Sequence, residues 1–329
     1  MAGREVVSQE LPHRRTRLFG AAGVSLVDFR CREHGERDSP EEPNPTHSIA
    51  FVRRGVFRRR HLGRTVLADA GHVLFFNAGH PYQYSHPVPG GDDCTILTVE
   101  TSAALELVAR YAPRDAQDPT APFRLGHGRL SSRLTRLHYE LLAALRYGAT
   151  ALAVEDVLSH FSYEAVRTAY MSHAISHRAA DSTAERRHHD LAEATKVFVN
   201  RQLHDIPSLA SLARTLSCSP FHLSRVFHET EGVTLRRYAG RLRGHLAADA
   251  LAKGTSNLTD LALRLGYTDH SHFTNAFRRE WGCPPSQFRQ RYRRRTSSVG
   301  WTYAGSGSAG APSREAPVYL TNPGLRTRD

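Results

Sequence analysis

The chain has 329 residues, enough for two domains of ordinary size, each with its own hydrophobic core. Its first residues hold no apolar stretch typical of a secretion signal, and no run of about twenty apolar residues could span a bilayer. The four cysteines lie far apart in the sequence, so neither a disulfide framework nor a zinc site is expected. A cytoplasmic protein with reduced thiols and no membrane partner is the simplest interpretation.

The net charge of +12 is concentrated in one region of the chain. Residues 208–295 contain 15 Lys and Arg against 6 Asp and Glu, whereas residues 1–207 contain 26 against 24. Nearly all of the excess is arginine, whose planar donors suit phosphates and guanine edges. Charge alone leaves two interpretations open, a nucleic-acid-binding surface and a solvated basic face.

The N-terminal part is predicted to be rich in strands. From residue 17 to about residue 101, short β-prone runs alternate with Gly, Pro and Asn at the spacing typical of small sandwiches and barrels. These runs are 24–30, 48–54, 55–61, 64–70, 72–77 and 94–100. Residues 69–80 predict a strand, a turn and a second strand.

From Ser102 the apolar period becomes helical. One apolar stripe runs through residues 134–145 and another through residues 154–165, so an antiparallel pair of helices joined across Gly148 is expected. The stripes fit packing on the barrel within one chain, and they also fit an interface between two copies.

Three segments lack the pattern of a packed core. Residues 1–16 and 296–329 are expected to be disordered ends, and the polar, His-rich residues 171–189 are expected to be a linker. His188 and His189 could suggest a metal, but adjacent residues face different sides of a helix and no third ligand is placed. The predicted domains are therefore residues 17–170 and 190–295.

The basic region repeats one pattern. Residues 212–227 read LARTLSCSPFHLSRVF, and residues 261–277 read LALRLGYTDHSHFTNAF. Each copy has Leu and Ala on one helical face, a short turn, and a second helix that begins at Ser219-Pro220 or at Thr268-Asp269. Each is therefore predicted to be a helix-turn-helix motif. Residues 234–252 predict a connecting helix about 28 Å long, which suits the roughly 34 Å between successive major-groove segments.

The 100° step of an α-helix separates inward from outward side chains in each second helix. With the apolar residues inward, the outward side chains are Phe221, Ser224, Arg225 and His228 in the first copy and His270, Ser271, Thr274, Asn275 and Arg278 in the second. Arg can bond guanine, Asn can bond adenine, and Ser or Thr can bond either base. These nine residues are the candidate DNA-binding residues, and double-stranded DNA is the predicted partner. A helical bundle with duplicated packing would explain the inward residues but not the outward stripes or the charge.

This arrangement resembles the DNA-binding domain of AraC/XylS-type transcriptional regulators over residues 190–292. The family's closing signature is matched at Ala262, Gly266, Tyr267, Phe273, Phe277, Gly282, Pro285, Phe288 and Arg289. The resemblance implies that base contacts come from the outward faces of both recognition helices. Leu235 and Pro284 depart from the family pattern, and Asn275 stands where many relatives carry Arg, so the family's base preference cannot be transferred.

The N-terminal half resembles the same family's cupin-like sensor domain, through residues 71–87 (GHVLFFNAGHPYQYSHP). The resemblance implies an α+β chain. A cupin-like β-barrel with trailing helices would sense a small-molecule effector or form a homodimer, and an all-α domain with two helix-turn-helix motifs would follow. A bacterial regulator that acts with RNA polymerase is implied, as an activator or a repressor.

The alternative is a metal-dependent cupin enzyme with a helical appendage. Such a barrel needs two His close together, a Glu shortly after and a later His. Here His80 and His86 are six positions apart, with no Glu until Glu100. We therefore expect no enzyme, no catalytic residue, no metal ligand and no cofactor, and the effector site stays unassigned.

Overall fold

The computed structural model describes residues 13–21, 23–176 and 183–293. Most of the two expected disordered ends and part of the expected linker lie outside these described residues. None of the described helices combines the length and the apolar character that a membrane span requires.

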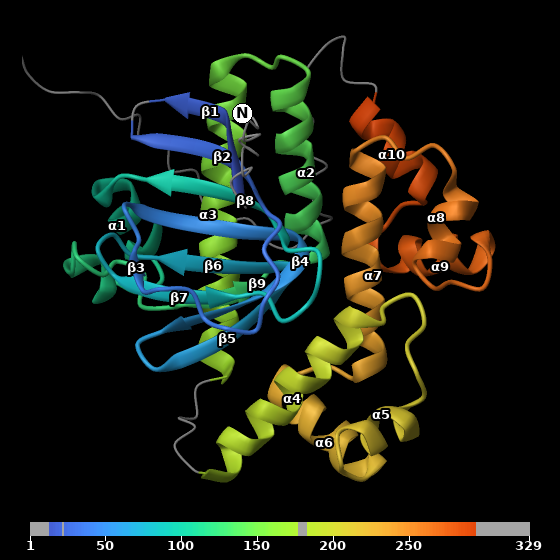
Figure 1. Cartoon of the computed structure of the whole chain (residues 1–329). Helices are drawn as coiled ribbons and strands as arrows, with labels where there is room; N and C mark the ends of the chain where they lie inside the picture. Colours follow the sequence, from blue (N-terminus) through green and yellow to red (C-terminus); the bar gives the residue numbers. More distant parts are fainter. Residues whose placement is uncertain (1–12, 22, 177–182, 294–329) are drawn as a thin grey trace, which may run out of the picture. The chain divides into compact units, whose positions relative to one another are not determined.

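The N-terminal half forms one nine-stranded antiparallel sheet (Figure 1). Its strands are β1 (His13–Ala21), β2 (Val24–Cys31), β3 (Glu42–Pro43), β4 (His47–His61), β5 (Arg64–Asp69), β6 (His72–Phe76), β7 (Pro81–Ser85), β8 (Asp92–Val99) and β9 (His127–Arg129). The main path is β1-β2-β8-β4-β6-β9, and among the described residues β1 and β9 do not pair. The mixed fold, with an N-terminal sheet and C-terminal helices, is thus confirmed, whereas closure of the sheet into a barrel is not.

The predicted strands 48–54 and 55–61 form a single long strand, β4, that changes partners at Gly55. Residues up to Gly55 pair with β8, and those from Val56 onward pair with β5 and β7. Gly55 has a φ of 83°, and a Cβ there would overlap the carbonyl oxygen of Gly91. Glycine is required at this point, because the backbone is left-handed and closely approached.

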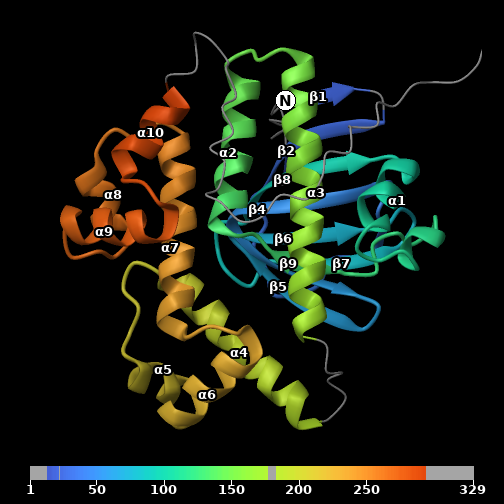
Figure 2. The same ribbon diagram turned by 180° about the vertical axis from the view of Figure 1, so that it is seen from behind.

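The predicted antiparallel helices are α2 (Ser132–Arg146) and α3 (Ala151–Ser176), which follow α1 (Thr101–Ala109) and the short 3₁₀ turn η1 (Asp115–Gln117). Figure 2 shows α3 lying across one face of the sheet. Phe51 of β4 packs against Phe161 of α3, with ring centroids 4.6 Å apart, and His138 of α2 stacks on Phe161 at 5.2 Å. Burial lowers the pKa of His138 to about 3, so its neutral ring packs as an aromatic side chain.

In the described part of the C-terminal half, residues 183–293, all regular elements are helices. They are α4 (Thr183–Arg201), α5 (Leu209–Thr215), α6 (Pro220–Glu231), α7 (Leu235–Ala252), α8 (Leu258–Arg264), α9 (His270–Trp281) and α10 (Pro285–Arg293). Helix α7 contributes to two apolar cores: Tyr238 and Leu242 pack with α4 to α6, whereas Ala247 and Leu251 pack with α8 to α10. The predicted connecting helix is confirmed, and the two helix-turn-helix units lie along it, one toward each end (Figures 1 and 2).

Candidate nucleic-acid interface

The first recognition helix, α6, has a well-defined start and end. The Ser219 side chain accepts a hydrogen bond from the backbone N–H of His222 at 3.2 Å, and Pro220 occupies the first helical turn, where a missing N–H costs nothing. Gly232 ends the helix in a left-handed conformation with a φ of 68°. The Leu223 and Phe227 side chains are fully buried against the supporting helices.

The second recognition helix, α9, repeats this design with different residues. The Asp269 side chain accepts from the backbone N–H of His272 at 2.7 Å, and Gly282 ends the helix with a φ of 71°. Phe273 and Phe277 are buried, and the Phe277 ring stacks on Trp281 at 5.4 Å. The two helices are therefore fixed by equivalent caps and equivalent apolar residues.

The two turns differ in how they reach the left-handed conformation. Ser217 in the first turn has a φ of 54°, and Gly266 in the second has a φ of 76°. A Cβ on Gly266 would overlap the carbonyl oxygen of His204. Glycine is needed in the second turn for space as well as for conformation.

The outward faces of α6 and α9 are exposed to solvent. Eight of the nine predicted residues are exposed: Phe221, Ser224, Arg225, His228, His270, Ser271, Asn275 and Arg278. The Phe221 side chain is 90% exposed, which is unusual for a large apolar residue. These faces are therefore available to a partner.

Thr274 differs from the other eight residues. It is partly buried, and its hydroxyl oxygen is shielded from solvent without a hydrogen-bond partner among the described residues. A buried hydroxyl cannot bond a base edge without a change of rotamer. This leaves the Thr274 methyl group as the part that could meet a partner.

Arg225 is held by its own helix. Its Nη1 donates to both carboxylate oxygens of Glu229, at 3.2 and 3.3 Å. The Arg225 and Glu229 side chains are 56% and 50% exposed, so water screens the pair and it contributes little to stability. The guanidinium group can leave Glu229 at low cost when another acceptor is present.

Exposed arginines surround both units. They are Arg214, Arg225, Arg236, Arg237, Arg264, Arg278, Arg279 and Arg291. Half or more of the hydrogen bonds in protein–DNA complexes go to phosphate or sugar, and arginine is a common donor. The region can therefore neutralise a phosphate backbone as well as meet bases.

A buried polar cluster joins the sheet to α7. The carboxylate of Asp69 is fully buried, and its Oδ2 accepts a hydrogen bond from the Tyr238 hydroxyl at 2.6 Å. Its Oδ1 lies 2.8 Å from His72 Nδ1 and 3.5 Å from Arg129 Nη1. Burial alone would raise the pKa of Asp69, but His72 and Arg129 hold that pKa well below its usual range. The carboxylate is therefore charged and fully paired.

The same cluster reaches the end of α6. Arg129 Nη2 donates to Glu231 Oε2 at 2.7 Å, and Lys196 Nζ of α4 donates to Glu231 Oε1 at 3.2 Å. Glu231 is the last residue of α6. Residues of the sheet and of α4 thus hold the C-terminal end of the first recognition helix.

A second set of contacts holds the end of α9. The Ser132 hydroxyl donates to Glu280 Oε1 at 2.8 Å, and Arg136 Nη1 donates to the backbone oxygen of Trp281 at 3.3 Å. Arg129 ends β9, and Ser132 and Arg136 lie in the first turns of α2; we call residues 129–136 the clamp segment. One stretch of chain therefore contacts the C-terminal ends of both recognition helices.

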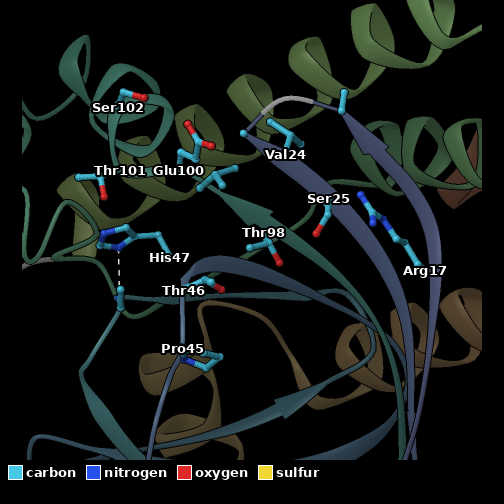
Figure 3. Close-up of a pocket in the computed structure, with 14 residues that line it drawn as sticks. Arg17, Val24, Ser25, Pro45, Thr46, His47, Thr98, Glu100, Thr101 and Ser102 are labelled. Carbon is cyan, nitrogen blue, oxygen red and sulfur yellow. Dashed lines mark hydrogen bonds between the residues drawn. The ribbon is translucent and has the colours of Figure 1, made fainter.

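The sheet carries a cavity of about 630 Å³ at the ends of β1, β2 and β8 (Figure 3). Its polar lining includes Arg17, Ser25, His47, Thr98 and Glu100. The His47 ring accepts a hydrogen bond from the backbone N–H of Ala78 at 3.2 Å, and burial lowers the pKa of His47. The cavity can hold a small molecule with several hydrogen-bonding groups.

The outward faces were predicted from the sequence, whereas the polar cluster and the clamp segment were not. Asp69 and Tyr238 are 169 positions apart, and no local pattern marks a carboxylate that a distant hydroxyl will bury. One available signal is that Tyr238 occupies the place that Phe288 holds in the second copy of the repeat.

Two family models match the chain. One is described as a helix-turn-helix domain and matches residues 212–291, which include both recognition helices. The other is described as an AraC-binding-like domain and matches residues 13–161, which include the sheet and α2. The helix-turn-helix model thus lies in the C-terminal half, and the AraC-binding-like model lies in the N-terminal half.

Curated relatives are similar mainly over the helical half. The chain is 29% identical over 93 residues to the bifunctional transcriptional activator/DNA repair enzyme AdaA of Bacillus subtilis, which is 28% of this chain and 44% of that protein. It is 38% identical over 80 residues to the transcriptional activator RhaS of Escherichia coli, 24% of this chain and 29% of RhaS. It is 20% identical over 225 residues to the transcriptional activator RhaR of Mannheimia succiniciproducens, 68% of this chain and 76% of RhaR. The chain thus spans less than half of AdaA and of RhaS.

Among solved structures, the chain is similar to ToxT of Vibrio cholerae, with 11% sequence identity and a TM-score of 0.32. The alignment covers 82% of this chain and 98% of ToxT. A TM-score this low supports no conclusion about function.

Proposed function

This chain belongs to the AraC family of transcriptional regulators, and we propose that it binds double-stranded DNA through α6 and α9, placed in two successive segments of the major groove. One chain would then bind two successive major-groove segments, which usually requires a dimer of proteins with one helix-turn-helix motif each.

The observation that carries the proposal is the pair of capped helices attached to one rigid helix. Both α6 and α9 bury their apolar residues, expose polar residues, and connect through α7. With 18 residues, α7 is about 27 Å long, comparable to the roughly 34 Å repeat of the major groove. The seven exposed arginines other than Arg225 are proposed to contact phosphates.

The exposed side chains suggest individual roles. Arg225 is placed to bond guanine, Asn275 to bond adenine, and Ser224 and Ser271 to bond either base. Phe221 offers an apolar contact to a thymine methyl group. These roles follow from the hydrogen-bonding chemistry of each side chain, and His228, His270 and Arg278 are proposed as further contacts on the same two faces.

Thr274 requires a revised role. Because its hydroxyl is buried, we propose a methyl contact to thymine rather than a hydrogen bond.

We also propose that the N-terminal domain controls the two recognition helices through the clamp segment. Arg129 contacts the end of α6, and Ser132 and Arg136 contact the end of α9. A change in the sheet that moves residues 129–136 would alter both helices at once. The cavity lined by Arg17, His47 and Glu100 is the proposed effector site, and a small polar molecule is the proposed effector.

A regulator is favoured over a metal-dependent cupin enzyme because the matched models describe a helix-turn-helix domain and an AraC-binding-like domain, and because none of the described residues forms the His, His and Glu arrangement of such an enzyme. Transcription activation is the proposed mode, in line with the names of the relatives. A second copy of the chain and RNA polymerase are proposed partners, and the cytoplasm, where DNA is accessible, is the proposed location.

Selection of bound sites from a pool of random duplexes tests the proposal. We expect an enriched site with two conserved blocks whose centres are about one helical turn apart. Absence of enrichment, or a single block bound by both helices, would contradict it.

A further inference from the structure

The fold gathers four buried residues with metal-binding side chains at one end of β2 and β8. They are Cys31 at the end of β2, His86 after β7, and Asp92 and Cys94 on β8; each is at most 3% exposed. The ligand atoms of Cys31, His86 and Asp92 all lie within 4.8 Å of one another. The Cys94 thiol donates a hydrogen bond to Asp92 Oδ2 at 3.0 Å and so supports the group from the adjacent position on the same face.

The strand register explains how distant residues meet. Cys31 lies directly opposite Asp92 in the β2–β8 pair, and Cys94, two positions further on, projects from the same face. His86 is held by a two-way backbone bridge to Gly35, with N–O distances of 2.8 and 3.2 Å.

The turn before β8 has a backbone that only glycine suits. Gly90 and Gly91 have φ values of 103° and 63°, and a Cβ on Gly91 would overlap the carbonyl oxygen of Cys31. Because these two residues are glycines, the turn can bring Asp92 close to Cys31 at the end of β2.

The donor set matches one class of metal. One thiol, one imidazole and one carboxylate are ligand types that zinc accepts, and three protein ligands leave the fourth position of a tetrahedron to another ligand. The three ligand atoms lie within 4.8 Å of one another, and on binding the 2.8 Å between His86 Nε2 and Asp92 Oδ1 would widen to the roughly 3.3–3.8 Å that separates neighbouring ligands of zinc.

We propose that Cys31, His86 and Asp92 bind one Zn²⁺ ion that fixes the end of β2 to the start of β8. The ion would neutralise the charge of a buried carboxylate and a buried thiolate. Asp93, the next residue after Asp92, pairs with Arg32 at 2.8 Å and with Lys253 of α7 at 3.3 Å, so the site borders the contact between the sheet and the helices.

The competing account is a metal-free hydrogen-bonded cluster. In it His86 is an imidazolium that donates to Asp92 at 2.8 Å; burial lowers the pKa of His86, but hydrogen bonds to Asp92 and Cys31 raise it to about 9. This account predicts no metal and no change on adding one, which separates it from the zinc site.

The first experiment uses the full wild-type chain. We expect about one zinc per purified chain by elemental analysis, and a rise in the thermal midpoint when Zn²⁺ is returned to chelator-treated protein. Addition of Co²⁺ to the stripped protein should produce the intense visible bands of a tetrahedral site and a thiolate charge-transfer band. Absence of both Co²⁺ bands, with no thermal shift on Zn²⁺ addition, would overturn the proposal.

The second experiment compares matched variants by competition with a coloured chelator. Cys31→Ser should weaken Zn²⁺ binding at least about 100-fold, more than is usual for residues that only support a ligand. Cys218→Ser, in the turn of the first helix-turn-helix unit, is the matched control and should bind as the wild type does. Equal affinity of the wild type and Cys31→Ser would overturn the site. If Cys31→Ser does not fold, Asp92→Asn takes its place, and the wild-type cobalt spectrum still decides.

Discussion

Arg129 Nη2 donates a hydrogen bond to Glu231 Oε2 at 2.7 Å, and this contact links the sheet of the N-terminal domain to the last residue of the first recognition helix. Three residues further along the clamp segment, Ser132 contacts Glu280 near the end of the second recognition helix. The geometry of both helices therefore depends on residues outside the helix-turn-helix units, which is what control by an N-terminal domain requires.

Replacing Arg129 by Ala should lower the free energy of unfolding by about 1–3 kcal/mol. The effect stays below that of a fully buried pair because the Arg129 side chain is 35% exposed, but Asp69 and Glu231 both lose a partner. Urea denaturation measures the change. Arg124→Ala removes an arginine that is 61% exposed and paired only near the surface, and it should change stability by less than about 0.5 kcal/mol. Equal effects of the two substitutions would contradict a structural role for the clamp segment.

Replacing Tyr238 by Phe tests the buried carboxylate more narrowly. The change removes only the hydroxyl, which donates to Asp69 and accepts from Asn200 Nδ2 at 2.9 Å, and it leaves the ring packed against Phe227. A buried acceptor without its donor should cost about 1–3 kcal/mol. Tyr267→Phe is the matched control, because its ring contacts with Phe273 are kept and little change is expected. A loss below about 0.5 kcal/mol at Tyr238 would show that Asp69 does not need this donor.

The pH dependence of stability should reflect Asp69. Its pKa is below the ordinary value in the folded chain, so the unfolded chain binds the proton more readily at acid pH. The stabilisation is present above about pH 4, the ordinary pKa of Asp, and decreases as the pH falls further. The wild type should therefore lose stability between about pH 5 and pH 3 more steeply than Asp69→Asn does. Identical slopes for the two proteins would be inconsistent with a charged, paired carboxylate.

Substitutions in the two turns should change the stability of the chain in opposite directions. Gly266→Ala should cost at least about 2 kcal/mol, because a Cβ combines left-handed strain with overlap on His204. Ser217→Gly should stabilise the chain by about 0.5–1 kcal/mol, because it relieves strain at a φ of 54°. Gly232→Ala, at a φ of 68° with open space around it, should lie between them in effect. A Gly266→Ala variant as stable as Gly232→Ala would exclude the predicted overlap.

The recognition helices could be predicted from the sequence because their determinants are local. Ser219, Pro220 and Asp269 mark helix starts within a few residues of the apolar positions that they serve. The sheet was harder to predict. Two strands were expected where β4 is one, because Gly55 resembles a break between strands, whereas it is a left-handed residue within one strand at which the pairing partner changes.

The long-range sites could not be predicted, because they arise from pairing rather than from pattern. The four cysteines are scattered in the sequence, yet the β2–β8 register brings Cys31 and Cys94 to the same group as Asp92. In the sequence, Asp69 likewise resembles an ordinary turn residue. The hydrogen bond from the Tyr238 hydroxyl is visible only in the tertiary structure. In both cases the side chains belong to segments whose relative position only the tertiary structure defines.

The most direct test of the central claim is the affinity of two single variants for the DNA site that the wild type selects. Arg225→Ala should relax base preference only in the block read by α6, and Asn275→Ala only in the block read by α9, each at a cost of about 1–3 kcal/mol. The wild type should also lose affinity steeply with added salt, as phosphate contacts require. If either substitution weakens binding equally to the selected site and to random DNA, or if both change the same block, then α6 and α9 do not read separate segments of the groove.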